Sequence, residues 1–140
     1  MTLNNFARAY GIAFLLIGLS GFVPGLSPLH AHPGLAVDAG SANALGLFPV
    51  NILHNLFHLA FGAWGLLAAR DAGAARGYAR GVAIIYGLLT VMGLIPLTNT
   101  TFGLVPIYGN DVWLHALLAG VAAYFGFVHR DRAGAAGSRR

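Results

Sequence analysis

Two pairs of ionisable residues lie inside apolar stretches of this chain, and their types and spacing are suited to binding a ligand. His54 and His58 are four residues apart, as are Asp111 and His115. Because residues four apart lie on one face of a helix, each pair forms a polar ridge. Imidazole nitrogens and carboxylate oxygens are ordinary ligands of divalent metal ions. The pattern predicts a metal site whose ligands are His54, His58, Asp111 and His115.

The two ridges belong to a longer pattern that occurs twice. A shift of 57 positions places G-L-F-P-V, which starts at residue 46, on G-L-V-P-I, which starts at residue 103. The same shift places His54 on Asp111 and His58 on His115. The residues able to do chemistry therefore occupy matching positions of two similar segments.

Composition indicates the solvent in which these segments lie. Apolar residues make up 57% of the chain and charged residues 9%, and the mean hydropathy is +0.71. Because a soluble domain carries about a quarter charged residues, the chain is predicted to lie in a lipid bilayer. There is no cysteine, which excludes a disulfide framework, a thiolate metal site and a cysteine nucleophile.

Helices of membrane-spanning length, about 20 apolar residues each, are needed to position the two ridges. The apolar segments predict four of them, at about residues 6–23, 49–69, 78–95 and 110–129. Pro49 is placed in the first turn of the second helix, where its missing N–H would be unpaired in any case. Glycines and prolines between residues 25 and 47 predict an outer loop with a short surface helix at residues 42–47. The predicted fold class is an all-α bundle of four transmembrane helices.

The first and third predicted helices also match. A shift of 72 positions places Phe14 on Tyr86. An apolar segment after an N-terminal basic residue can be a signal peptide, but a removable leader would have no reason to resemble an internal helix. The chain is therefore interpreted as a single domain of two tandem, parallel helix-hairpin repeats. The repeats span about residues 6–71 and 78–131 and are followed by a tail at residues 132–140.

The arginines give this arrangement an orientation. All eight lie on one side of the four-helix arrangement. Because positive residues favour the cytoplasmic side, the net charge of +4 is interpreted as a topology signal, and both termini are predicted to be cytoplasmic. Parallel repeats are normally related by a pseudo-two-fold axis along the membrane normal. Matching residues then lie at equal depth, which places His58 and His115 near the bilayer centre.

His58 and His115 also permit interpretations other than a metal site. Two histidines at equal depth on facing helices are suited to be the axial ligands of a haem, or to bind one chlorophyll-type pigment each. The same imidazoles also serve as hydrogen-bonded struts between helices, which bind nothing. A symmetric strut would be duplicated as readily as a symmetric ligand, so the repeat leaves these interpretations open.

Several motifs resemble one known family. These are R-x3-I near the start of the first and third helices, G-L-x-P in both halves, H-N-L-F-H, and the D-x3-H of the last helix. Together they resemble a family of small bacterial four-helix membrane proteins catalogued only as a domain of unknown function. The resemblance covers about residues 6–128. It implies a four-helix membrane fold in a bacterial cell membrane and assigns no functional residues.

These observations favour a non-enzymatic integral membrane protein, an accessory or ligand-binding subunit of the bacterial inner membrane. Its expected partners are the lipid bilayer and either further copies of the chain or a larger membrane complex, and not nucleic acid. A metal- or haem-dependent membrane redox protein is the first alternative. A small transporter or channel is the second, since transporters also combine repeats with a polar site near mid-membrane.

Overall fold

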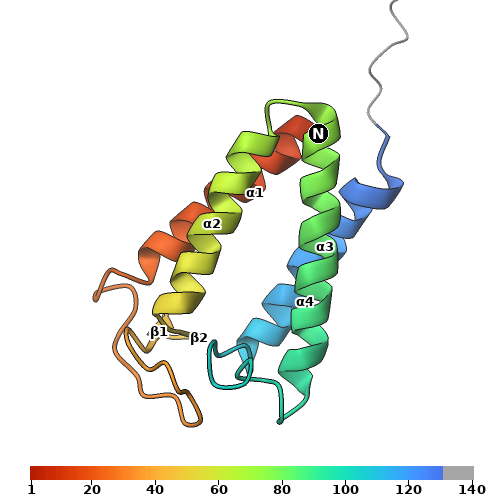
Figure 1. Ribbon diagram of the computed structural model, residues 1–140. Coiled ribbons are helices and arrows are strands. Elements are labelled where there is room, and N and C mark those ends of the chain that lie inside the picture. The colour runs from red at the N-terminus through yellow and green to blue at the C-terminus, as the bar shows by residue number, and fades with distance from the viewer. Residues whose placement is uncertain (131–140) are drawn as a thin grey trace, which may run out of the picture.

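Helices make up most of the protein, whose computed structural model describes residues 1–130. Within that range the helices are α1 (Leu3–Ser20), α2 (Ile52–Ala68), α3 (Ala72–Leu94) and α4 (Asn110–Ala123), and α4 continues as a π-helical turn, η1 (Tyr124–Val128) (Figure 1). The prediction of a mainly helical fold with four long helices is confirmed. The predicted tail at residues 132–140 and the end of the second predicted repeat lie outside the described residues.

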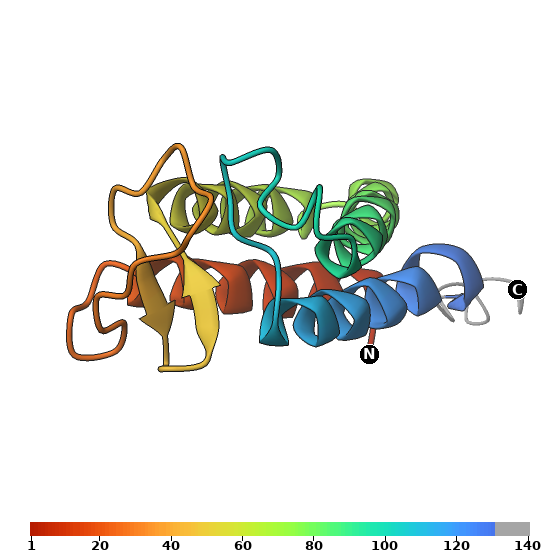
Figure 2. The ribbon, with the colours of Figure 1, turned by 90° about the horizontal axis from the view of Figure 1, so that it is seen from below.

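The four helices form two hairpins. α1 packs along α2, and α3 packs along α4. The N-terminus and the turn between α2 and α3 lie at the upper end in Figure 1, while the two long loops, residues 21–41 and 95–109, lie at the lower end. Both loops are seen at that end of the helices in Figure 2. They are joined to each other, because the Ala36 N–H donates a 2.8 Å hydrogen bond to the carbonyl of Gly103.

The connection between α2 and α3 is shorter than the sequence predicts. α3 begins at Ala72, where the Asp71 carboxylate caps the helix by accepting a 2.8 Å hydrogen bond from the Ala74 N–H. Such a cap stabilises a helix by about 1 kcal/mol, which offsets the cost of roughly 1 kcal/mol for one glycine inside a helix. Gly73 and Gly77 lie within α3, which therefore begins before the predicted start at about residue 78.

A small two-stranded sheet occupies the place of the predicted surface helix. β1 (Ala42–Ala44) pairs antiparallel with β2 (Phe48–Val50). Between them, Leu45 and Gly46 have positive φ angles of 53° and 71°. Two successive residues in this conformation make a tight hairpin turn and do not fit a right-handed helix. The helix predicted at residues 42–47 is therefore wrong.

Asn51, and not Pro49, marks the start of α2. Pro49 lies in β2, and the Asn51 side chain caps the helix by accepting a 2.9 Å hydrogen bond from the His54 N–H. The Asn51 amide nitrogen also donates to the carbonyls of Val37 (2.8 Å) and Leu104 (2.7 Å), one from each long loop. The predicted place of Pro49 in the first helical turn is wrong, because asparagine is a preferred N-cap and this one also holds both loops.

Aromatic rings fill the interface between the two hairpins. Phe6 of α1 lies 6.5 Å from Tyr78 of α3, and Phe14 lies 5.3 Å from Tyr86, measured between ring centroids. All four side chains are buried. In both pairs, the two residues are ones that the 72-residue shift aligns. The contact between the hairpins therefore runs through matching positions of the two halves.

Within the first hairpin, α1 and α2 approach each other closely at glycines. A Cβ atom added to Gly11 would lie 2.8 Å from the backbone nitrogen of Leu66 and 2.9 Å from the carbonyl oxygen of Gly62. Backbone atoms cannot turn aside as the end of a flexible side chain can. A larger residue at position 11 must therefore push the two helices apart.

The Gly11→Ala variant is expected to lower the free energy of unfolding by about 1–3 kcal/mol, the usual cost of overpacking. The control is Gly87→Ala in α3, where an added Cβ meets nothing within 4 Å. There the substitution is expected to stabilise the helix by about 1 kcal/mol. Denaturant titration of both variants under the same conditions measures the difference. Equal stabilities would contradict the close approach of α1 and α2.

The outward surface of the helices is rich in apolar side chains. Large apolar residues more than half exposed occur on every one of the four, among them Leu16, Phe57, Ile84 and Leu117. Two helices of the described chain, Ala72–Leu94 and Asn110–Val128, are long and apolar enough to cross a membrane, whereas α2 is apolar but shorter. Soluble monomers rarely expose contiguous apolar patches larger than a few hundred Å². This surface is therefore suited to contact with lipid or with other apolar surfaces.

Candidate metal centre

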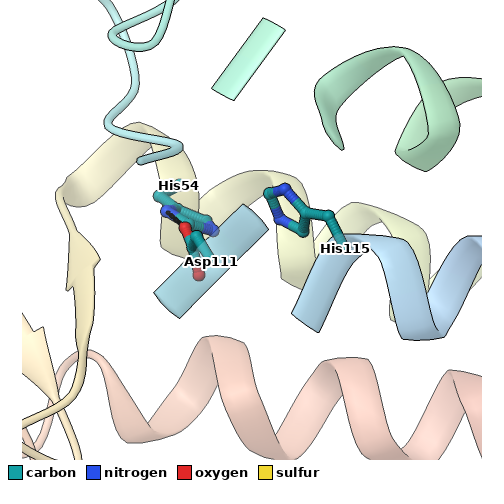
Figure 3. Close-up of side chains that lie close together, drawn as sticks. All are labelled: His54, Asp111 and His115. Carbon is teal, nitrogen blue, oxygen red and sulfur yellow. Dashed lines mark ion pairs between the residues drawn. The ribbon is translucent and has the colours of Figure 1, made fainter. Parts of the chain in front are cut away.

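His54, Asp111 and His115 converge between the two hairpins (Figure 3). His54 belongs to α2, and the other two residues belong to α4. Each exposes 3% or less of its surface. His54 Nδ1 lies 3.7 Å from Asp111 Oδ2, and one ligand atom from each of the three residues lies within 4.8 Å of the other two. The cluster is thus shared between the two halves of the chain.

The starts of two helices position these side chains. The Asn51 cap holds the first turn of α2, which contains His54. α4 begins directly after Gly109, whose φ of 66° glycine adopts without strain. The Asn110 side chain donates a 3.2 Å hydrogen bond to a carbonyl in the turn between β1 and β2. Asp111 then falls in the first turn of α4, where the helix dipole favours a negative charge.

His58 lies one turn farther along α2 and stays outside this cluster. Its ring stacks on that of His54, with 4.7 Å between the centroids and 15° between the planes. Its Nδ1 lies 3.1 Å from the His54 carbonyl oxygen, and because a carbonyl only accepts, Nδ1 carries the proton. Nε2 of the neutral ring then has a lone pair. Of the four predicted metal ligands, the structure brings three together and places His58 beside them.

Unpaired polar atoms are concentrated at this place. Six buried side-chain nitrogen or oxygen atoms within residues 1–130 have no hydrogen-bond partner. Four of these are His54 Nδ1, His58 Nε2, Asp111 Oδ2 and His115 Nδ1. An unpaired buried polar group costs about 1–3 kcal/mol, and most such groups in folded proteins are paired. A concentration of unpaired buried polar atoms is typical of a site that binds a ligand or an ion.

The three converging residues fit a divalent metal ion. The 3.7 Å between His54 Nδ1 and Asp111 Oδ2 is longer than a hydrogen bond, which spans about 2.7–3.2 Å. Bonds of about 2.0–2.1 Å to a tetrahedral ion place the ligand atoms roughly 3.3 Å apart. The ligand atoms, now within 4.8 Å of one another, reach that spacing if the longest separation shortens by about 1.5 Å.

A family model described as a domain of unknown function, DUF4383, matches residues 4–128 of the chain. The chain belongs to this DUF4383 family. The resemblance found in the sequence is therefore confirmed, and the matched range contains every residue of the predicted metal site. No curated protein and no solved structure matches the chain.

Two aromatic residues of this DUF4383 protein pack against the histidines and were not predicted as part of the site. Phe14 lies 5.6 Å from His58, and Tyr86 lies 5.0 Å from His115, edge-on at 86°. The 72-residue shift aligns the two aromatic residues, and the 57-residue shift aligns the two histidines. Equivalent residues of two similar halves make equivalent contacts, so the contact of Phe14 with His58 corresponds to the contact of Tyr86 with His115. The two shifts, taken together, would have indicated these aromatic neighbours of the histidines.

The haem or pigment site predicted at His58 and His115 of this DUF4383 chain stays a prediction. Each of the two rings keeps one unpaired nitrogen, and a nitrogen of this kind is what a haem iron or a pigment magnesium binds. His115 belongs to the metal cluster, whereas His58 does not. The two histidines therefore have different surroundings despite their matching positions.

Proposed function

We propose that this protein spans the membrane with four helices and binds a divalent transition-metal ion between its two hairpins. The proposed ligands are His54, Asp111 and His115. One observation carries the proposal: these buried side chains come from both hairpins, and each has an unpaired ligand atom. Two imidazoles and a carboxylate suit zinc and neighbouring transition metals, and three protein ligands leave one coordination position open.

The protein would act as an accessory or ligand-binding subunit in the bacterial inner membrane, and not as an enzyme by itself. The apolar outer faces of its helices support contact with lipid and with further copies of the chain or a larger complex. Trp113 on α4, for example, is 72% exposed. An exposed surface of this kind marks membrane or protein contact.

The arginines support cytoplasmic termini. Arg8 lies near the start of α1, Arg80 lies in the first half of α3, and Arg130 follows η1, all toward the end of the bundle opposite the long loops. A reporter active only in the periplasm is expected to be inactive when fused after residue 130 and active when inserted between residues 30 and 40. An active reporter at the C-terminal position would overturn this topology.

Contacts between aligned residues support an internal pseudo-two-fold axis. Residues that a two-fold axis relates can contact each other only close to that axis. The aligned pairs in contact are Phe6 with Tyr78, Phe14 with Tyr86, and His54 with Asp111. The proposed metal site would then lie on the axis itself.

Metal analysis of the purified protein tests the proposal. Protein isolated with an affinity tag that contains no histidine is expected to bind about one equivalent of a transition metal after chelator treatment and titration. The control is His30→Gln, which removes an exposed loop histidine and should leave the stoichiometry unchanged. A titration without saturable binding would show that the cluster is a structural strut.

A further inference from the structure

Two arginines of α3 converge on one carbonyl oxygen of η1. Arg80 Nε donates a 2.9 Å hydrogen bond to the carbonyl of Gly126, and Arg76 Nη1 lies 3.4 Å from the same oxygen. Arg76 Nη1 also donates to the carbonyl of His129 at 3.0 Å. η1 packs against α3 toward the end of the protein opposite the long loops (Figure 1). Two positive side chains therefore meet at this end of the bundle.

Close packing of η1 against α3 holds the Arg80 side chain in place. A Cβ atom added to Gly126 would lie 3.0 Å from both the backbone nitrogen and the Cγ atom of Arg80. The Arg80 guanidinium also lies over the ring of Phe127, 5.3 Å from its centroid, which is within the range of a cation–π contact. A side chain that is already ordered loses less conformational entropy when it binds a ligand.

Neither arginine has an anionic partner within residues 1–130. The ion pair in that range joins His54 to Asp111, and the Asp71 carboxylate caps the start of α3. Arg80 donates through Nε alone, so its four Nη hydrogens have no acceptor within the described chain. A guanidinium stays charged and presents its donors as a planar fork. Such a fork, next to a second positive charge, is suited to bind a phosphate.

The surroundings of the pair indicate the source of that phosphate. Arg80 is exposed and lies roughly 12 Å along α3 from Ala72, at about 1.5 Å per residue. Phe127 and Val128 of η1 are 56% and 65% exposed. Where a helix crosses a membrane, a charged group beside exposed apolar side chains lies at the boundary between head groups and hydrocarbon. The phosphates found at this boundary belong to phospholipids.

We propose that Arg76 and Arg80 bind the phosphate of an anionic phospholipid at the cytoplasmic end of the protein. The Nη hydrogens of Arg80 donate to two phosphate oxygens, and Arg76 supplies the second positive charge. Phe127 and Val128 contact the first methylenes of the acyl chains. An anionic lipid is favoured over a zwitterionic one, whose ammonium the two arginines repel. The inference rests on the proposed membrane placement and does not depend on the metal cluster.

Titration of the full-length protein in detergent with phosphatidylglycerol and with phosphatidylcholine of the same acyl chains tests this inference. Native mass spectrometry counts the bound lipids. Phosphatidylglycerol is expected to bind at least about tenfold more tightly than phosphatidylcholine. Inorganic phosphate, titrated into the same protein by calorimetry, should bind far more weakly than phosphatidylglycerol because it has no acyl chains. Equal binding of the two lipids would overturn the site, and so would inorganic phosphate that binds as tightly as phosphatidylglycerol.

Single substitutions separate this site from the general positive charge at the same end. Arg80→Gln removes the charge but keeps an amide that can donate to the Gly126 carbonyl, and it is expected to lose about tenfold in phosphatidylglycerol affinity. Arg70→Gln removes the same charge from an exposed residue before α3 and should lose less than about threefold. Equal losses in these two variants would overturn the site.

Arg80→Lys provides a second test that keeps the charge, and it applies even if Arg80→Gln does not fold. Lysine lacks the planar fork, so this variant is expected to bind phosphatidylglycerol more weakly than the wild type and more tightly than Arg80→Gln. Binding as tight as that of the wild type would overturn the proposed pair of hydrogen bonds to the phosphate.

Carbonate extraction of cell membranes separates this inference from the proposed function. If the protein stays in the membrane but binds both lipids equally, the lipid site alone is refuted. If carbonate releases the protein, the membrane placement is refuted and the lipid site with it. If the wild type holds no metal but prefers phosphatidylglycerol, the metal proposal fails and the lipid site stands.

Discussion

Replacing His115 by alanine is expected to lower metal affinity by more than about 100-fold, since the loss of a mere outer-shell partner already costs 10–100-fold. The same replacement of His58 is expected to change it by less than about tenfold. The two residues match in type, in spacing and in position within their halves, but only His115 belongs to the cluster of ligand atoms within 4.8 Å. Each variant therefore serves as the control for the other.

Competition titration with a metal-binding dye measures both affinities. Asp111→Asn belongs in the same series, because it keeps the shape of the side chain and removes its charge, and it should also bind the metal more weakly than the wild type. Equal losses in His58→Ala and His115→Ala would contradict the three-residue cluster. Such a result with a haem absorbance band would instead support ligation by His58 and His115 as a pair.

Replacing Asn51 by alanine is expected to lower the free energy of unfolding by roughly 2–4 kcal/mol. The substitution removes the cap of α2, which is worth about 1 kcal/mol. It also removes the part-buried hydrogen bonds that Asn51 donates to the carbonyls of Val37 and Leu104, each worth about 0.5–1.5 kcal/mol. Because the cap bonds to the N–H of His54, metal affinity should fall as well.

Thr2→Ala is the matched control for Asn51→Ala. Thr2 caps α1 by accepting a 3.2 Å hydrogen bond from the Asn5 N–H, but this bond is exposed and Thr2 holds no loop. Its loss should cost about 1 kcal/mol or less. Denaturant titration compares the two variants, and the site model requires that only Asn51→Ala also weakens metal binding. Similar effects of both substitutions would show that Asn51 acts as a cap alone.

Spacing along the chain singled out three residues that lie together in the structure, but it did not indicate which way each side chain points. His54 and His58 share a helix face, as predicted, yet only His54 reaches Asp111. The reason is local, because the His58 ring bonds to the carbonyl of the preceding turn. Sequence periodicity does not report a side-chain rotamer, so it cannot separate a ligand from the neighbour that stacks on it.

The four long helices were predictable because their apolar segments are long, whereas the ends and loops depend on contacts distant in sequence. β1 forms because Ala42 pairs with Val50 and bridges to Leu29. The start of α2 depends on Asn51, whose amide reaches Leu104 in the other hairpin. A strand of three residues has too little periodicity to be distinguished from a short helix. The membrane placement and the repeat stay predictions that the experiments above address.

Fusion of two hairpins into one polypeptide permits a pairing that two identical subunits cannot make. In a symmetric homodimer, a residue beside the two-fold axis meets its own copy. A dimer of the first hairpin would set histidine against histidine, and a dimer of the second would set aspartate against aspartate, where two buried carboxylates repel each other. Within one polypeptide the two positions are free to differ, and His54 meets Asp111 at 3.7 Å. The predicted repeat thus allows an unlike pair of side chains to meet between two similar hairpins.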